Sequence, residues 1–379
     1  MRVGVVVPGF CADDKDWCIP ALTNLIRQLS QVVDVVVFSL RYPHNRSVYS
    51  CRGAKVVALG GAEKRGVKTG YLLKSARQSI CREHAAEPFD LLHAFWAHEP
   101  GWVVTSVAKK LNIPKLVSIM GGELVGLKNI HYGNQLHFAS RRLIHAALSN
   151  ADLVTVGSQT LLERTGQFFP GNGEKKVRLL PLGVNTSLFH VNTVPATLSK
   201  IRELQLLHVG SLVAVKNYRF LFTAVKRVLE TQPAHLHLCG DGPLLTELQR
   251  LGHELGMAEN VTFHGEIGHE KLANYYQRAD LLLVTSHFES QGMVVLEAGG
   301  CGLPTVGADV GMLPELQPGV VCIQDDKPET LAQAILSLVE NPQKYQKMCG
   351  EIRAKVEKQY FVEHTTEALL KIYEMLLSL

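Results

Sequence analysis

Short apolar runs alternate with helical patterns along almost the whole chain of 379 residues. A strand buried on both faces of a parallel sheet reads as an unbroken apolar run, and each parallel strand needs a crossover, usually a helix, before the next. The alternation therefore predicts doubly wound parallel α/β sheets with helices on both faces. Because 379 residues exceed one ordinary hydrophobic core, two such domains are expected.

The expected elements follow from the period of the apolar residues. In the first half, strands are expected at 3–7, 34–40, 55–59, 90–94, 115–119, 152–156 and 177–181, and helices at 19–30, 71–84, 102–111, 136–149 and 160–169. In the second half, strands are expected at 204–209, 235–239, 261–264 and 280–285, helices at 218–230, 244–255, 270–277 and 329–340, and two more helices within 342–379. Periodicity weakens after Phe189, which predicts domains at 1–189 and 190–361, with the last helix, about 362–379, packing back on the first domain.

Bulk composition excludes several classes of protein. No apolar run approaches the roughly 20 residues that cross a bilayer, and the apolar start of the chain is too short for a secretion signal. The net charge of +4 weakly favours anionic ligands and does not predict nucleic-acid binding. The 8 cysteines are scattered without a Cys-x-x-Cys pair, as expected for reduced thiols in a cytoplasmic protein. The sequence contains no His-Glu-x-x-His motif, so it predicts no metal site of that kind.

The segment 280–304 carries the strongest chemical signal. An apolar strand is followed by Glu289 in a loop, a turn at Gly292 and a helix that contains Glu297. The first helical turn, at Gly292, Met293 and Val294, should present backbone N–H groups to an anion such as a diphosphate. Glu297 lies roughly 7 Å further along the axis, on the exposed or cleft-facing side of the helix, where its carboxylate could accept hydrogen bonds from ribose hydroxyls. By spacing alone, a solvated loop residue and a helix surface charge are the simpler interpretation.

The residues around these two carboxylates favour the functional interpretation. Glu289-x7-Glu297, within Phe-Glu-Ser-x-Gly-x-x-x-x-Glu-Ala, resembles the Glu-x7-Glu signature of the retaining glycosyltransferase family 4. The resemblance implies a GT-B fold, in which two Rossmann-like doubly wound domains face each other across a cleft. It also implies that the second domain binds a nucleotide diphosphate sugar.

Other family motifs occur in the expected order. Residues 209–217 resemble the phosphate loop Gly-Arg-x5-Lys, with Lys216 kept and Ser211 in place of arginine. Residues 239–243 resemble the Gly-x-Gly-Pro loop near the donor, with Gly240 and Asp241, and residues 263–267 resemble the segment that frames the base, with Gly265 and Ile267. Residues 180–189 and 310–315 resemble the family's hinge and its Gly-Gly-x-Pro-Glu turn.

The first half departs further from the family pattern. Gly9 stands alone where members usually have a Gly-Gly pair, and Met120-Gly121-Gly122-Glu123 replaces His-Gly-x-Asp/Glu. Methionine cannot donate the hydrogen bond that this histidine would make. Because the resemblance assigns the acceptor to this domain, the candidate acceptor contacts are His93, His98, Gly121, Glu123 and His131. For each histidine, a structural role is the alternative.

The resemblance implies a retaining, metal-independent hexosyltransferase without a cofactor. The donor would be a nucleotide diphosphate sugar such as a UDP- or GDP-sugar, and the acceptor a hydroxyl of a glycan, a lipid-linked sugar or a small molecule. Lys216 and the helix amides would stabilise the leaving diphosphate, Glu289 would orient sugar hydroxyls, and Glu297 would hold ribose. Two alternatives remain open, a GT-B sugar-nucleotide epimerase and a non-catalytic sugar-nucleotide-binding subunit.

A lesser hypothesis concerns peripheral contact with the inner face of the membrane. A basic and partly apolar stretch comprises Lys64, Arg65, Lys68, Lys74, Arg77 and Arg82 with Val67, Tyr71, Leu72, Leu73 and Ile80. Such a stretch can rest on anionic lipid. A solvated helix face is the more common meaning of such a run.

Overall fold

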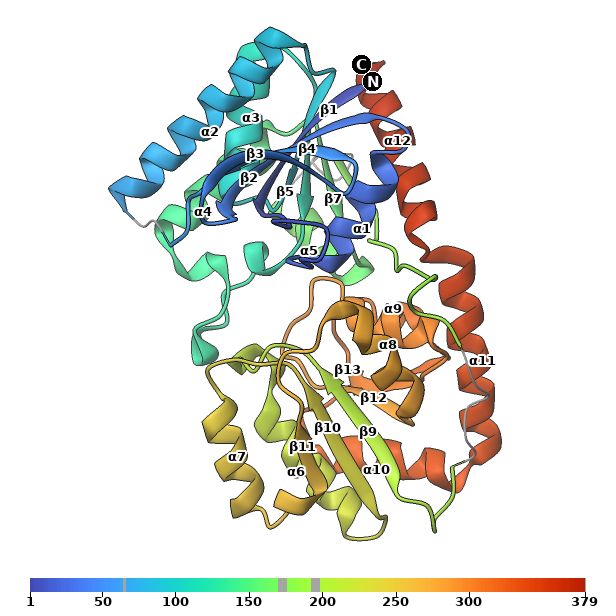
Figure 1. The fold of residues 1–379 in the computed structure, drawn as a ribbon. Helices are drawn as coiled ribbons and strands as arrows, with labels where there is room; N and C mark the ends of the chain where they lie inside the picture. Colours follow the sequence, from blue (N-terminus) through green and yellow to red (C-terminus); the bar gives the residue numbers. More distant parts are fainter. Residues whose placement is uncertain (64–65, 170–175, 192–197, 379) are drawn as a thin grey trace. The chain divides into compact units, whose positions relative to one another are not determined.

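The computed structural model describes the chain except residues 64–65, 170–175, 192–197 and 379 (Figure 1). The chain divides into two compact units, Met1–Gly183 with Val362–Leu379, and Val184–Phe361. The expected boundary after Phe189 therefore lies too far along the chain. The backbone N–H of Val184 donates to the carbonyl of Tyr360 at 2.8 Å, and Phe189 is buried in the core of the second unit. Residues 192–197, just beyond the expected boundary, lie outside the described residues.

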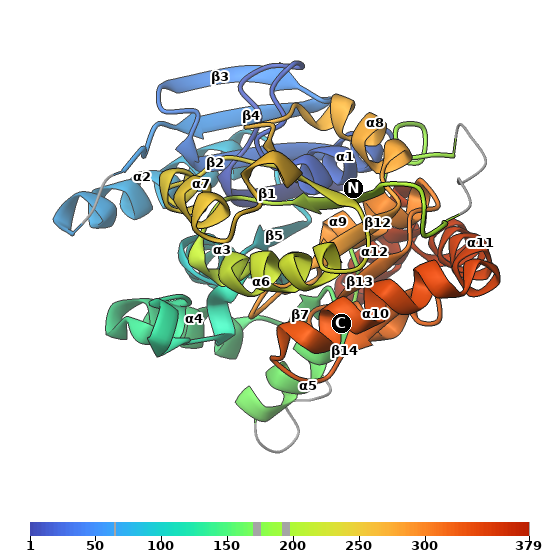
Figure 2. The same cartoon turned by 90° about the horizontal axis from the view of Figure 1, so that it is seen from below.

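The first unit contains an 8-stranded sheet with the strand order β3-β4-β2-β1-β5-β6-β7-β8. Its strands are β1 (Arg2–Gly9), β2 (Asp34–Tyr42), β3 (Arg46–Cys51), β4 (Ala54–Leu59), β5 (Leu91–Phe95), β6 (Lys115–Ile119), β7 (Leu153–Val156) and β8 (Val177–Leu179). All neighbours are parallel except β3 and β4, which run antiparallel at one edge of the sheet (Figure 2). The interior strands β1, β5, β6 and β7 are almost wholly buried because both faces of this part of the sheet are covered.

The helices of the first unit return the chain between parallel strands. They are α1 (Pro20–Leu29), α2 (Val67–Ala86), α3 (Glu99–Leu111), α4 (Phe138–Asn150), α5 (Gln159–Phe168) and the C-terminal α12 (Val362–Leu377). Helix α12 lies beside α1 although the two are far apart in the sequence (Figure 1). Its Tyr373 is fully buried, and the phenol lies 2.8 Å from Nδ1 of His93 in β5. Helix α12 thus belongs to this unit through buried packing and a buried polar contact.

The second unit contains a 6-stranded, wholly parallel sheet with the order β11-β10-β9-β12-β13-β14. Its strands are β9 (Leu204–Val209), β10 (Ala234–Cys239), β11 (Val261–Phe263), β12 (Leu281–Val284), β13 (Thr305–Ala308) and β14 (Val320–Ile323). The strand order reverses between β9 and β12. In open α/β sheets, ligands bind outside the carboxyl ends of the strands at such a switch point.

Helices cover both faces of the second sheet and enclose two hydrophobic cores. They are α6 (Tyr218–Leu229), α7 (Leu245–Glu254), α8 (His269–Arg278), α9 (Met293–Gly300), α10 (Pro328–Glu340) and α11 (Pro342–Gln359). Residues of α6, α7 and α10 form the core on one face, and residues of α8 and α9 form the core on the other. Helix α11 contributes residues to both cores. Short 3-10 helices occur at Gly122–Leu124, Lys128–Ile130, Asn134–Leu136, Ala214–Lys216, Ala258–Asn260 and Pro314–Leu316.

The fold class agrees with the sequence, since both units are parallel-sheet α/β domains. Strand β3 is the clearest difference, because no strand is expected at Arg46–Cys51. It is an antiparallel edge strand with mostly exposed side chains, so it carries no apolar run. Within the described residues, no helix combines the length and the apolar character needed to cross a bilayer.

Candidate functional site

Two loops meet at the switch point of the second sheet, one after β9 and one after β12. The backbone N–H of His287 donates to the carbonyl of Val215 at 2.8 Å, and the hydroxyl of Thr285 donates to the carbonyl of Lys216 at 2.9 Å. These bonds hold the phosphate-loop segment and the Glu289 segment against each other. The pieces that the sequence places in one site are therefore neighbours in this unit.

Lys216 and Glu289 form a short, largely buried ion pair. Nζ of Lys216 lies 2.6 Å from Oε1 of Glu289, and the two side chains are 18% and 14% exposed. The hydroxyl of Ser286 donates to the same oxygen at 2.6 Å. Because both charged groups have partners that fix their positions, the pair presents one positioned cation and one positioned carboxylate.

The loop after β9 is held in shape by buried partners. The hydroxyl of Tyr218 donates to the carbonyls of Gly210 and Ser211 at 3.2 and 3.1 Å. Beneath the loop, Nδ1 of His208 lies 2.9 Å from the carbonyl of Leu283. Burial, and next the nearby Lys216, lower the pKa of His208 to about 4, so this imidazole is neutral near pH 7. His208 is therefore a neutral structural support, and Lys216 is the cationic side chain beside it.

Helix α9 begins beside this ion pair. Gly292 is its N-cap with φ of +90°, a left-handed conformation that favours glycine. A Cβ added there would lie 3.9 Å from Cβ of Glu289, so the helix start and the carboxylate are adjacent. The first N–H groups of a helix have no carbonyl partner within the helix and carry partial positive charge. Met293 and Val294 stand at these positions and are partly exposed.

A cavity of about 340 Å³ opens at the carboxyl ends of β9 and β10. Its lining includes four residues that the sequence assigns to the donor, namely Ser211, Gly240, Asp241 and Ile267. Gly240 has φ of +144°, and a Cβ there would lie 2.0 Å from the carbonyl oxygen of Gly210. Its N–H donates to the carbonyl of Gly265 at 2.8 Å. Glycine at 240 thus lets two loops approach closely and shapes one wall of the cavity.

Gly210 lies between the cavity and the side chain of Lys216. Gly210 lines the cavity, and a Cβ added to it would lie 3.1 Å from Cε of Lys216. The lysine stem therefore packs against the wall of the cavity. An anion held at the start of α9 and a nucleoside held in the cavity would both lie next to Lys216.

Of the two placements expected for Glu297, the exposed one is wrong. Its side chain is buried, and the hydroxyl of Tyr276 donates to Oε2 at 2.8 Å. Burial raises the pKa of Glu297 to about 7, opposed by the Tyr276 hydrogen bond. Nδ1 of His269 lies 3.8 Å from Oε1, but burial lowers the pKa of His269 to about 4, so this contact is no ion pair at neutral pH.

This buried carboxyl should make stability depend on pH. The unfolded carboxyl ionises near pH 4.3 and the folded one near pH 7, so the folded state holds the proton more tightly between these values. The favourable contribution is complete below about pH 4 and is lost as the pH rises to about 7. We expect Glu297→Gln to remove this part of the pH dependence in denaturant unfolding series. Glu259→Gln, at an exposed position, is the control, and equal slopes for wild type and Glu297→Gln would contradict the assignment.

His93 is not available to an acceptor. The residue is fully buried in β5, with Nε2 lying 2.7 Å from the hydroxyl of Ser118 and Nδ1 2.8 Å from the phenol of Tyr373. Burial lowers its pKa to about 3. The prediction that His93 contacts the acceptor is wrong because its ring joins β5 to β6 and α12 in the interior.

Glu123 is likewise a structural residue. Its carboxylate is buried and accepts hydrogen bonds from the backbone N–H groups of Met120, Gly121 and Ala97 at 3.1, 2.6 and 3.2 Å. Burial raises its pKa in spite of these bonds. The prediction that Glu123 contacts the acceptor is wrong, since the carboxylate fastens the loop after β6 to the loop after β5. Gly121 lies in that fastened loop and is partly exposed.

The remaining first-unit candidates have different surroundings. Gly9 is buried at the end of β1, where a Cβ would lie 3.3 Å from both Sγ of Cys18 and Cβ of Tyr42. Packing of neighbouring side chains explains this glycine. His98 is partly buried before α3, and burial lowers its pKa, opposed by Glu99. His131 is exposed on a loop.

Sequence reasoning missed the partners that hold these groups. Arg41 at the end of β2 makes two hydrogen bonds of 2.8 and 2.6 Å to Glu99 at the start of α3, and Tyr276 of α8 engages Glu297. No sequence motif indicates either pair, because each pair joins side chains of two different elements. Their contact depends on how the elements pack in the folded unit, which the sequence positions alone do not give.

Comparison with known proteins decides the family. The family model described as "Glycosyl transferases group 1" matches residues 195–355, and the one described as "Glycosyltransferase Family 4" matches residues 21–188. The chain belongs to glycosyltransferase family 4. Over 319 residues it is 27% identical to D-inositol 3-phosphate glycosyltransferase from Corynebacterium jeikeium, covering 79% of this chain and 75% of the relative.

Solved structures agree with this assignment at the level of the fold. Sucrose-phosphate synthase from Thermosynechococcus elongatus superposes with a TM-score of 0.82 and 22% identity, covering 100% of this chain and 99% of that chain. HepE from Anabaena, solved in complex with UDP and glucose, gives a TM-score of 0.73 at 19% identity, with 100% of both chains covered. The family 4 glycosyltransferase described here therefore has the GT-B fold class, with two parallel-sheet α/β domains.

Proposed function

We propose that this family 4 glycosyltransferase is a retaining enzyme that transfers a hexose from a nucleotide diphosphate sugar to an acceptor hydroxyl. The observation that carries the proposal is the buried Lys216–Glu289 pair, with 2.6 Å between Nζ and Oε1, beside the start of α9 and the cavity below Gly240. One cation, one carboxylate and a helix start thus lie near one another, and Gly210 connects them to the wall of the cavity. These are the groups that a diphosphate sugar requires.

The donor would be held in the second unit. Its diphosphate would accept hydrogen bonds from Lys216 and from the N–H groups of Met293 and Val294. Glu289 would accept hydrogen bonds from hydroxyls of the sugar. The nucleoside would lie in the cavity between Ile267 and Gly240. The hydroxyl of Tyr276 already donates to Oε2 of Glu297. A ribose hydroxyl would therefore donate its hydrogen bond to Oε1.

The proposed reaction needs no nucleophile, cofactor or metal from the protein. The bond between the anomeric carbon and the diphosphate oxygen breaks, and the acceptor oxygen bonds to the same face of the sugar. The proton of the acceptor hydroxyl passes to the departing phosphate oxygen. Lys216 and the α9 amides would stabilise the negative charge that develops there.

A panel of donors tests this function. Purified protein is incubated with UDP- and GDP-sugars and with glycan, lipid-linked and small-molecule acceptors, and released nucleotide and products are analysed. Because HepE was solved with UDP and glucose, UDP-glucose is the first donor to test. The expected product keeps the anomeric configuration of the donor. An inverted product would exclude the retaining reaction, and activity that depends on added divalent metal would exclude metal independence.

The two alternatives give different results in the same panel. An epimerase changes its donor without any acceptor, and a binding subunit raises its thermal stability with a nucleotide sugar but releases no nucleotide. The family matches and the named relatives favour the transferase. Ser211 in place of arginine leaves Lys216 as the cation of the proposed phosphate loop.

We also propose that α2 rests on the anionic inner face of the cytoplasmic membrane. Val67 and Tyr71 are 78% and 71% exposed, and Lys68, Lys74 and Arg82 are exposed on the same helix. Large exposed apolar side chains among cations are typical of helices that bind the membrane interface. Leu72, Leu73 and Ile80 face the core instead, and Lys64 and Arg65 lie outside the described residues.

Charge reversal on α2 should abolish binding to anionic vesicles. We expect Lys68→Glu/Lys74→Glu to lose flotation with vesicles that contain phosphatidylglycerol, because each basic residue contributes about 1 kcal/mol near an anionic surface. Lys344→Glu/Lys347→Glu, on exposed positions of α11, is the matched control. Equal flotation of both variants would remove the membrane proposal.

A further inference from the structure

A second cavity of about 530 Å³ lies in the same unit as the donor site but shares no described lining residue with it. One wall is a face of α8 formed by Lys271, Asn274, Tyr275 and Arg278. These positions follow the spacing i, i+3, i+4 and i+7, so they lie along one side of the helix. The opposite wall comes from Gln205, Leu207, His237 and His264. The volume is in the range of small-molecule sites.

The charged side chains that line this cavity are both basic. Lys271 and Arg278 are its charged lining residues, and among the described residues no carboxylate belongs to the lining. Across the part of the chain that the structure describes, neither cation forms an ion pair. Because the two positions are seven residues apart in a helix, their backbones are separated by roughly 10 Å along the axis. Two long cationic side chains can therefore reach one anion from two sides.

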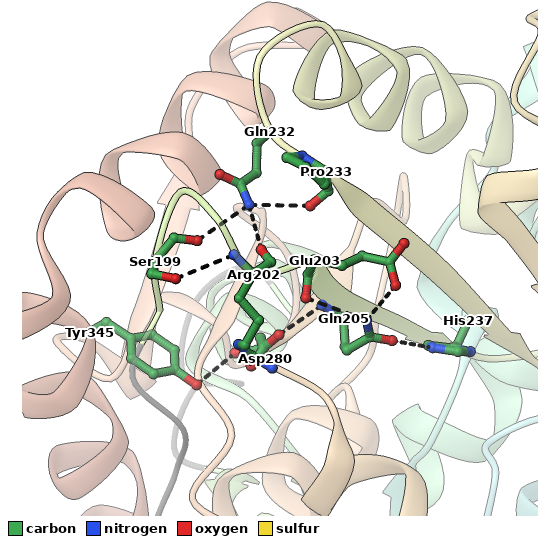
Figure 3. A network of polar contacts seen from close by, with 9 residues as sticks. All are labelled: Ser199, Arg202, Glu203, Gln205, Gln232, Pro233, His237, Asp280 and Tyr345. Atoms are coloured by element: carbon green, nitrogen blue, oxygen red, sulfur yellow. Dashed lines mark hydrogen bonds and ion pairs between the residues drawn. The ribbon is translucent and has the colours of Figure 1, made fainter.

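A chain of hydrogen bonds fixes the histidines on the opposite wall. Figure 3 shows Gln205 between Glu203 and His237. Nε2 of Gln205 donates to Oε2 of Glu203 at 3.1 Å, and Oε1 of Gln205 lies 2.9 Å from Nε2 of His237. A carboxylate only accepts, so the amide must turn its oxygen toward His237, which then donates from Nε2.

The same logic assigns the proton of the second histidine. Nδ1 of His237 lies 3.0 Å from Nε2 of His264. Because the proton of neutral His237 is on Nε2, its Nδ1 accepts, and His264 donates from Nε2. Nδ1 of His264 is then the one nitrogen of this pair that can take up a proton without breaking a hydrogen bond. The His264 ring is packed at 4.8 Å against Tyr275 of α8, which lines the cavity.

Both imidazoles are neutral in this arrangement. Burial, then His235 and His264, lower the pKa of His237 to about 4, while Glu203 acts in the opposite direction. Burial and His235 lower the pKa of His264. On the α8 side, Lys271 and Arg278 line the same cavity as these two rings. An anion between the two walls would reverse the balance and favour protonation of His264.

We infer that this cavity is a second ligand site, separate from the proposed donor site, and that it binds a small phosphate ester. Lys271 and Arg278 would pair with the phosphate, the arginine through two parallel N–H groups, and Nδ1–H of the His264 imidazolium would donate a third charge-assisted bond. Asn274 and Tyr275 would contact the remainder of the ligand. A phosphate monoester suits the site because it offers several acceptor oxygens to several donors.

Imidazole NMR provides a test that does not depend on sugar transfer. Histidine-labelled protein is saturated with UDP, so that the proposed donor site is occupied, and titrated with inorganic phosphate and with glycerol phosphate. The signals of His237 and His264 are assigned with His237→Gln and His264→Gln. We expect both ligands to shift these two signals and to raise the titration midpoint of His264 by about one pH unit.

Matched variants decide whether the cavity is responsible. Lys271→Ala/Arg278→Ala should weaken phosphate binding at least about tenfold, since the double variant removes two charge-assisted hydrogen bonds to the ligand. Arg250→Ala/Lys347→Ala removes the same charge from exposed positions and should bind as wild type does. Unshifted His264 signals, or equal binding by both double variants, would overturn the inference. So would a response only to phosphatidylcholine–phosphatidylglycerol vesicles, because a lipid head group would then be the ligand.

Discussion

Lys216→Ala should lower kcat for sugar transfer by about 10²–10³-fold, the usual cost of removing one positioned group that stabilises developing negative charge. Lys216 is the cation that contacts Glu289 at 2.6 Å and packs against Gly210 at the wall of the proposed donor cavity. Without it, the leaving diphosphate would keep only the α9 amides as partners. The loss should appear in kcat at saturating donor, since the charge develops mainly in the transition state.

The control for this variant is Lys347→Ala, which removes an exposed lysine of α11. It should leave kcat unchanged. Lys216→Arg should recover only part of the activity, because the planar guanidinium does not reproduce the position of a single ammonium. Turnover by Lys216→Ala at the rate of wild type would reject the proposed role of this residue.

Gly240→Ala should both destabilise the second unit and abolish donor binding. A Cβ at this position would lie 2.0 Å from the carbonyl oxygen of Gly210, and φ is +144°. The unfavourable backbone conformation alone costs about 1–3 kcal/mol. Relief of the overlap must move the backbone of one loop away from the other, because neither atom belongs to a flexible side chain. The wall of the donor cavity would then be displaced.

Thermal unfolding with and without UDP-sugar measures both effects. The melting temperature of Gly240→Ala should fall, and the increase caused by the nucleotide sugar should disappear. Gly268→Ala is the matched control, since φ is −57° and a Cβ would meet nothing within 4 Å. A Gly240→Ala protein with wild-type stability and an undiminished ligand shift would contradict the structure of this loop.

The fold could be predicted from sequence because buried parallel strands leave a strong local signal. The apolar runs that form β1, β5 and β12 are each bounded by helical patterns, and these strands occur within a few residues of their expected positions. Strand β3 could not be found in this way, because Arg46–Cys51 is exposed and pairs only with β4. Its position depends on the hairpin with its neighbour.

Only the loop residues of the candidate site could be placed from the sequence. Lys216 and Glu289 belong to loops at the carboxyl ends of neighbouring strands, so sequence position and strand order together place them side by side. The hydrogen-bond partners of Glu297 and His93 were not predictable. Each partner belongs to another element, Tyr276 of α8 for Glu297 and Tyr373 of α12 for His93. Only tertiary packing brings such partners together.

A crystal structure of the protein with a bound UDP-sugar is the decisive measurement for the proposed donor site. We predict diphosphate oxygens within about 3.2 Å of Nζ of Lys216 and of the amide nitrogens of Met293 and Val294, with the nucleoside in the cavity beside Gly240. Glu289 should then bond to hydroxyls of the sugar. A diphosphate bound away from the start of α9, with Lys216 still paired only to Glu289, would contradict this placement of the donor.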